Sequence, residues 1–136
     1  MEKMHENHYT VMFIIMIMSG MLTTMNVWVD KLDDIRFSIN DVYMTLLMCG
    51  WMFLFMGLSD KEPKIFILGL LLIVANIICI RKQYMVDEEQ YKLGMIPHHS
   101  MAVHMSRKLQ EKENKIGALI DNIIKTQEKE IEIFKR

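Results

Sequence analysis

The sequence predicts an all-α protein with three transmembrane helices followed by a C-terminal two-helix antiparallel hairpin. Three apolar runs before residue 82 are nearly free of charge, as bilayer-spanning helices are. Two later segments repeat apolar residues at spacings of three and four, with charged residues of both signs between them. We therefore divide the chain into a membrane domain, residues 1–82, and a C-terminal helical-hairpin domain, residues 83–136.

The three apolar runs cover about residues 11–29, 42–58 and 65–80. The first has the roughly 20 residues that a bilayer needs and lacks a small-residue cleavage site before Asp30, so we expect an uncleaved helix. The other two are shorter and gain length from flanking polar side chains that reach the interface. A polar turn at residues 59–64 should join them as an antiparallel pair.

Composition and charge exclude some classes and leave the membrane orientation open. The net charge of −1 and the lack of aromatic and basic residues in alternation argue against nucleic-acid binding. Cys49 and Cys79 lie in different apolar runs, which suits small buried side chains better than a zinc or disulfide site. Lysines and arginines are nearly balanced across the predicted membrane, so the positive-inside rule fixes no topology.

The C-terminal domain should begin with a helix at Asp87, an N-cap residue with Gln90 as its capping-box partner. Pro97 removes a backbone hydrogen bond within this helix and should kink it. After the polar segment 110–114, a second helix carries an Ile-rich stripe. Two amphipathic helices cannot bury both stripes alone, so we expect a partner hairpin from another subunit in a homo-oligomer.

Imidazole and thioether side chains gather on the first of these helices, at Met95, His98, His99, Met101, His104 and Met105. At about 100° per residue, Met95, His98, His99 and Met105 share one half of the helix, whereas His104 points away. Such donors suit Cu(I), or Ag(I) as its mimic, while harder cations select groups of carboxylates. The helix therefore predicts a copper site.

The second helix adds two polar residues beside its apolar stripe. Folding it back places Gln127 level with His98 and Glu130 level with Met95. Polar groups buried there need hydrogen-bond partners, and metal-bound imidazoles are suitable ones. The alternative is that both lie at the wet edge of the stripe and pair with lysines.

The run Met95-Ile96-Pro97-His98-His99, with Gln127, Glu130 and Ile131 after it, resembles the domain of unknown function 305 (DUF305) family, whose members carry MIPHH and a later Q-x-x-E-I. The resemblance covers residues 87–136, and a subset with three preceding membrane helices is similar to the whole chain. It implies a ferritin-like helical fold and, from some members, an extracytoplasmic copper-binding domain. By motif position it carries His98, His99, Gln127 and Glu130 over as site residues.

Two positions depart from the family pattern. His104 stands where an aspartate is common, which would add a metal ligand. Phe134 stands where a methionine is common, which would remove one.

Methionines also recur at four-residue intervals in the second apolar run, at Met44, Met48, Met52 and Met56. On a helix they form a slowly drifting ladder with steps of about 6 Å, which is a candidate path for Cu(I). It is similar to the MxxxM of three-span copper importers, although the chain lacks the GxxxG of their third helix. The alternative is that these methionines fill packing gaps and face lipid.

Three functions follow from these features. The leading one is a membrane-anchored Cu(I)-binding protein that acts in metal tolerance or delivery by ligand exchange. The others are an oligomeric metal transporter or channel with a methionine-lined path, and a structural membrane oligomer without metal. No nucleophile, base and orienting acid can be assembled, so an enzyme is not expected.

Overall fold

The computed structural model describes residues 2–136, with the side chains of Glu2 and His5 left aside. In these residues it has five α-helices, two 3₁₀ helices and no strand, which confirms the all-α fold class. The chain folds into two compact units, the first with residues up to Thr23 and Asn40–Met85, the second with Thr24–Ile39 and Val86–Arg136. The elements are α1 (Glu2–Leu22), η1 (Met25–Trp28), η2 (Leu32–Asp34), α2 (Ile39–Ser59), α3 (Pro63–Lys82), α4 (Glu88–Gln110) and α5 (Gly117–Phe134).

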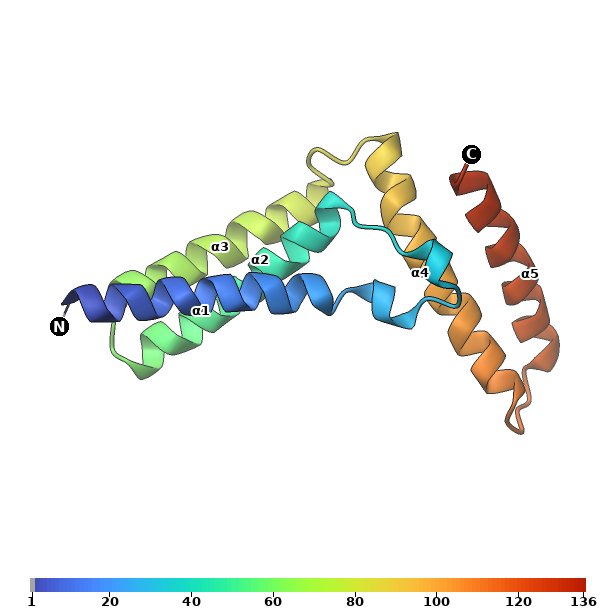
Figure 1. Ribbon diagram of the computed structural model, residues 1–136, viewed down its shortest axis with the longest axis horizontal. Helices are drawn as coiled ribbons and strands as arrows, with labels where there is room; N and C mark the ends of the chain where they lie inside the picture. Colours follow the sequence, from blue (N-terminus) through green and yellow to red (C-terminus); the bar gives the residue numbers. More distant parts are fainter. Residues whose placement is uncertain (1) are drawn as a thin grey trace. The chain divides into compact units, whose positions relative to one another are not determined.

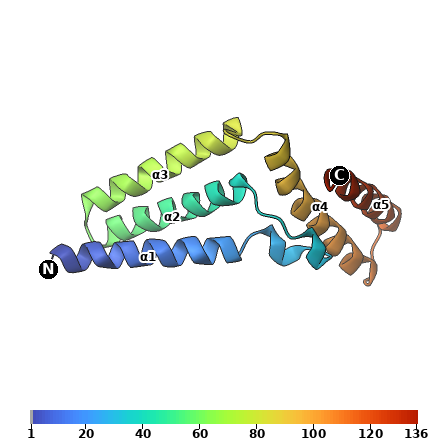
Figure 2. The ribbon, with the colours of Figure 1, turned by 45° about the horizontal axis from the view of Figure 1, so that its top comes forward.

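The first unit contains α1, α2 and α3, which lie side by side (Figures 1 and 2). Three segments are long and apolar enough to cross a membrane: Glu6–Trp28, Ile39–Ser59 and Pro63–Lys82. The predicted first run, 11–29, does not form one continuous helix. The helix starts earlier and ends at Leu22, where Thr23 Oγ1 donates to the carbonyl of Ser19 (2.8 Å).

The predicted turn between α2 and α3 is present. Lys61 has a left-handed backbone (φ 57°), and the Glu62 amide donates to the carbonyl of Gly57 (2.9 Å). Pro63 then opens α3, where a missing backbone N–H costs nothing. The two helices therefore run antiparallel.

Glycines allow α2 and α3 to touch through their backbones. A Cβ added to Gly57 would lie 2.3 Å from the Phe66 nitrogen, and one added to Gly69 would lie 2.4 Å from the Leu54 nitrogen. Since no side chain fits at such distances, these glycines set how closely the helices approach. The backbone contact holds the pair without a large apolar core between them.

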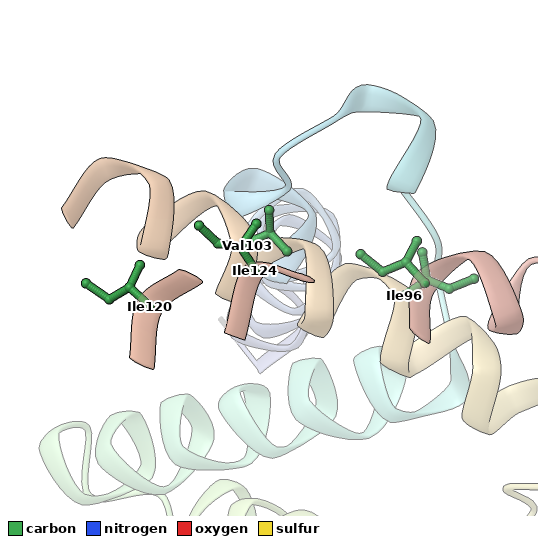
Figure 3. Packing of buried hydrophobic residues seen from close by; sticks show 5 residues of the cluster. Ile96, Val103, Ile120 and Ile124 are labelled. Carbon is green, nitrogen blue, oxygen red and sulfur yellow. The ribbon is translucent and has the colours of Figure 1, made fainter. Parts of the chain in front are cut away.

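The second unit has α4 and α5 as an antiparallel hairpin joined at residues 111–116, as predicted. Its core consists of isoleucines and one valine from the facing stripes, with Phe134 packed against them (Figure 3): Ile96, Val103, Ile120, Ile124 and Ile131. Each fully buried side chain of this size contributes roughly 1.5–3 kcal/mol. This small core sets the register that brings α5 polar residues to α4.

The connection between α1 and α2 completes the second unit, although the sequence places it in the membrane domain 1–82. The Ile39 amide donates to Gln90 Oε1 (2.7 Å), and the Asp30 amide donates to Ser100 Oγ (2.8 Å). Asp87 caps α4 as predicted, accepting from the Gln90 amide (2.8 Å). The side chain of Gln90, predicted as the capping-box partner of Asp87, accepts instead from the Ile39 amide and so ties the connection to α4.

Candidate functional site

His99 is buried in the second unit and both of its ring nitrogens have partners. Nδ1 lies 2.9 Å from the carbonyl oxygen of Met95, one turn earlier on α4, and Nε2 lies 2.7 Å from Glu130 Oε2 on α5. Phe134 packs edge-on against the imidazole ring, with centroids 5.2 Å apart. The predicted fold-back placed Glu130 level with Met95, and the structure places it one turn further along, at His99.

The partners of His99 determine where its hydrogens lie. A carbonyl only accepts, so Nδ1 carries a hydrogen toward Met95. One further proton lies between Nε2 and the Glu130 carboxyl group. A metal ion at Nε2 would replace that proton and force the pair apart, because metal–nitrogen and metal–oxygen bonds are each about 2 Å long.

A matched pair of substitutions tests this contact. Glu130→Gln keeps a polar group that can donate to Nε2, so we expect stability close to that of the native chain. Glu130→Ala leaves the nitrogen of a buried imidazole without its partner, which should lower the free energy of unfolding by about 1–2 kcal/mol. Denaturant unfolding in detergent would measure both, and equal losses would contradict the hydrogen-bonding role.

His98, the neighbour of His99, is exposed and faces the connection instead. Its Nδ1 lies 3.4 Å from the sulfur of Met25 in η1. Successive residues on a helix point about 100° apart, which is why the two imidazoles diverge, with ring centroids 6.1 Å apart. Sequence reasoning did not connect Met25 with His98, because the two stand 73 positions apart.

The other predicted site residues are more scattered. Met95 and Met101 are half-buried, and Met105 is 51% exposed. His104 faces the connection, with Nδ1 4.0 Å from Asp30 Oδ1, rather than pointing away from the protein. Gln127 is half-buried on α5.

The methionine ladder of α2 is partly exposed on the first unit. Met44 is 57% exposed and Met48 is at the surface, while Met52 and Met56 are half-buried. Met48 also packs close to Gly20 of α1. The ladder therefore forms a stripe along the surface of α2.

A second polar cluster lies where the connection meets both helices of the hairpin. Asp34 is 3% exposed and accepts from the Ser100 hydroxyl (2.6 Å) and from Lys135 Nζ (2.6 Å). Lys135 also bonds Asp33 Oδ2 (2.8 Å). Beside them, Arg107 forms ion pairs with Asp30 and Glu128. Sequence reasoning noted an acidic connection and did not foresee these partners.

Charge in this cluster favours the paired state. Burial lowers the pKa of Lys135, but the hydrogen bonds and charges of Asp33 and Asp34 outweigh burial and raise the pKa above its ordinary value. The hydrogen bond from Lys135 lowers the pKa of Asp33. Because the pKa of Lys135 is higher in the folded than in the unfolded chain, its pairing contributes its full stability at pH values below the unfolded-state pKa. This contribution is lost as the pH rises through the folded-state pKa. The pairing of Lys135 therefore persists at neutral pH and weakens in alkali, as Lys135 loses its proton, and in acid, as Asp33 gains one.

Within residues 2–136 as described, no three side chains of His, Cys, Asp or Glu converge as a metal-binding group. An imidazole and a thioether do come together at His98 Nδ1 and the Met25 sulfur, 3.4 Å apart.

Comparisons with known proteins agree with the sequence motif. The family model described as Domain of unknown function (DUF305) matches residues 82–136. An uncharacterised protein of Acanthamoeba polyphaga mimivirus is 37% identical over 138 residues, covering 94% of this chain and 89% of the relative. No solved structure matches the chain. Since the similarity to the viral relative extends over nearly all of both chains and the family model matches the C-terminal part, the chain belongs to the DUF305 family.

Proposed function

We propose that this protein is a small membrane-anchored protein that binds Cu(I), or Ag(I) in its place, and acts in metal tolerance or delivery. The observation that carries the proposal is the placement of His98. It is the exposed histidine of the pair, and Met95 and Met101 each lie three residues away along α4. Residues three apart on a helix are surface neighbours, so an ion reaching His98 from solvent meets thioethers on either side.

The chemistry of these donors fits a soft monovalent ion. Imidazole and thioether together favour Cu(I), whereas carboxylate groups select harder cations. Both donors are uncharged in the bound state, so ions can pass by stepwise ligand exchange to a site with stronger donors. Glu130 holds the adjacent His99 in place and so supports the part of α4 that carries His98.

The remaining parts of the proposal concern location and assembly. The three apolar helices would anchor the protein in lipid, with the C-terminal domain on the extracytoplasmic side. Exposed apolar residues at the start of α5, including Leu119 and the N-cap residue Ile116, support a homo-oligomer in which another subunit covers them.

Metal binding by the full-length chain in detergent tests the function. Under reducing conditions we expect purified protein to bind Ag(I) or Cu(I), measured by elemental analysis and by competition with a chelator. His98→Ala should abolish binding, as should His98→Ala combined with His99→Ala, because the exposed imidazole is the anchoring donor.

The matched control is His8→Ala, which removes an exposed histidine of the first unit and should leave metal binding unchanged. Native protein that binds neither ion, or a His98→Ala variant that binds as tightly as the native chain, would refute the proposal.

A further inference from the structure

We propose that Met25 is a ligand of the same metal site, so that one soft ion is held between the sulfur of Met25 in η1 and Nδ1 of His98 in α4. The inference rests on the proposed function and adds a donor from outside the residues that match the family model. Metal binding would then fasten the connection to the hairpin.

The distance between the two donors fits a shared ion. The Met25 sulfur and His98 Nδ1 are 3.4 Å apart. At the bond lengths known for zinc, about 2.0 Å to nitrogen and about 2.3 Å to sulfur, two donors at a tetrahedral angle lie about 3.5 Å apart. The pair could therefore accept a tetrahedral ion with little movement, by replacing the hydrogen that Nδ1 otherwise directs at the sulfur.

Both donors lie at the surface of the second unit. Met25 is 38% exposed and His98 is exposed on α4. Here the thioether stands at the surface with its sulfur toward an imidazole nitrogen, where an ion can enter.

His99 is a poorer candidate than Met25 for the ligand that shares the ion with His98. Its nitrogens are engaged with the Met95 carbonyl and Glu130, and a metal there would break a 2.7 Å hydrogen bond in the core of the unit. Binding at His98 and Met25 leaves these contacts intact. Met101, one turn along α4 from His98, is available as a further thioether.

Hydrogen bonds in the connection hold the segment around Met25 in place. The side chain of the next residue, Asn26, donates to the Arg36 carbonyl (2.7 Å) and accepts from the Arg36 amide (3.0 Å), which closes a loop. The Asp30 amide ties this loop to Ser100 of α4 (2.8 Å). Ligands positioned before the metal arrives lose less conformational entropy on binding.

The test compares Met25→Leu with Met18→Leu in the full-length protein, using Ag(I) under reducing conditions. Leucine keeps the volume and removes the sulfur, so the fold should survive, as unchanged Trp28 fluorescence in a Trp51→Phe background would show. Met25→Leu should weaken Ag(I) affinity at least as much as the roughly tenfold to hundredfold losses caused by removing supporting residues of metal sites. The control is Met18→Leu, since Met18 is 61% exposed on α1, and this variant should bind Ag(I) as tightly as the native chain does.

Two direct readouts accompany the affinity. In methyl NMR, the Met25 ε-methyl signal should shift on addition of Ag(I). Trypsin cleavage after Lys31 and Arg36 should slow when the ion is bound, because the connection is then fastened at both ends. If Met25→Leu binds Ag(I) as tightly as the native chain while His98→Ala does not, the role of Met25 is refuted and the proposed function stands. If the native chain binds no Ag(I), both fail.

Discussion

Replacing Asp34 by alanine is expected to loosen the connection from the hairpin and to lower the free energy of unfolding of the second unit by about 2–4 kcal/mol. The carboxylate is buried and accepts from two groups, Ser100 Oγ and Lys135 Nζ. Without it, a fully buried hydroxyl loses its acceptor and a partly buried ammonium group loses one of its two acceptors, and such losses are costly. Asp34→Asn keeps an oxygen acceptor for Ser100, so its free energy of unfolding should lie between those of the native chain and of Asp34→Ala.

Two measurements follow the connection separately from the membrane helices. In a Trp51→Phe background, Trp28 of η1 is the remaining tryptophan and reports denaturant unfolding of the second unit. Trypsin should also cut after Lys31 and Arg36 sooner in Asp34→Ala than in the native chain.

Asp33→Ala is the matched control for Asp34→Ala. Asp33 is the adjacent residue and bonds the same lysine, but its side chain is 85% exposed, so its ion pair is screened by water. We expect a much smaller loss of stability from this change. Equal losses at the two positions would show that burial of Asp34 is not what holds the connection.

Replacing Gly69 by alanine is expected to push α2 and α3 apart and to destabilise the first unit by about 1–3 kcal/mol, as overpacking does. The added Cβ would lie 2.4 Å from the nitrogen of Leu54 and 2.7 Å from the carbonyl oxygen of Gly50. Backbone atoms cannot rotate out of the way as side chains do. The loss would occur although alanine favours a helix over glycine by about 1 kcal/mol.

Unfolding by a denaturing detergent, followed by Trp51 fluorescence in a Trp28→Phe background, measures the change in the first unit. Gly117→Ala is the control, because a Cβ at Gly117 meets nothing closer than 3.7 Å. An unaltered midpoint for Gly69→Ala would mean that α2 and α3 tolerate separation, so that the glycines do not set their spacing.

Local patterns in the sequence were sufficient to predict the helices. Uncharged apolar runs, the proline after the turn and the Asp87 cap each act over a few residues, and the structure has each feature. The predicted end of the first helix was wrong, because Met25, Val27 and Trp28 continue the apolar run without continuing the helix. Apolar character does not distinguish a residue that spans a membrane from one that packs in a 3₁₀ turn.

The candidate site was predictable only where helix periodicity governs it. Folding one amphipathic helix back on another placed Glu130 level with Met95, and in the structure Glu130 meets His99, one turn further along α4. Adjacent histidines diverge on a helix, so the interpretation of His98 and His99 as one donor pair overlooked their geometry. The partners of Ser100 and His98 come from the connection, more than 60 positions away, and nothing in the local pattern of either segment identifies the other.

The position of the connection also has a consequence for biosynthesis. The second unit is discontinuous in the chain. The contacts of Asp34 are complete only after Lys135, 101 residues later, has been synthesised. During translation the connection therefore emerges, and α2 and α3 follow it, long before α4 and α5 exist to receive it. We expect the hairpin to be the last part of the protein to mature, and chains stopped before α5 to expose the connection to proteases.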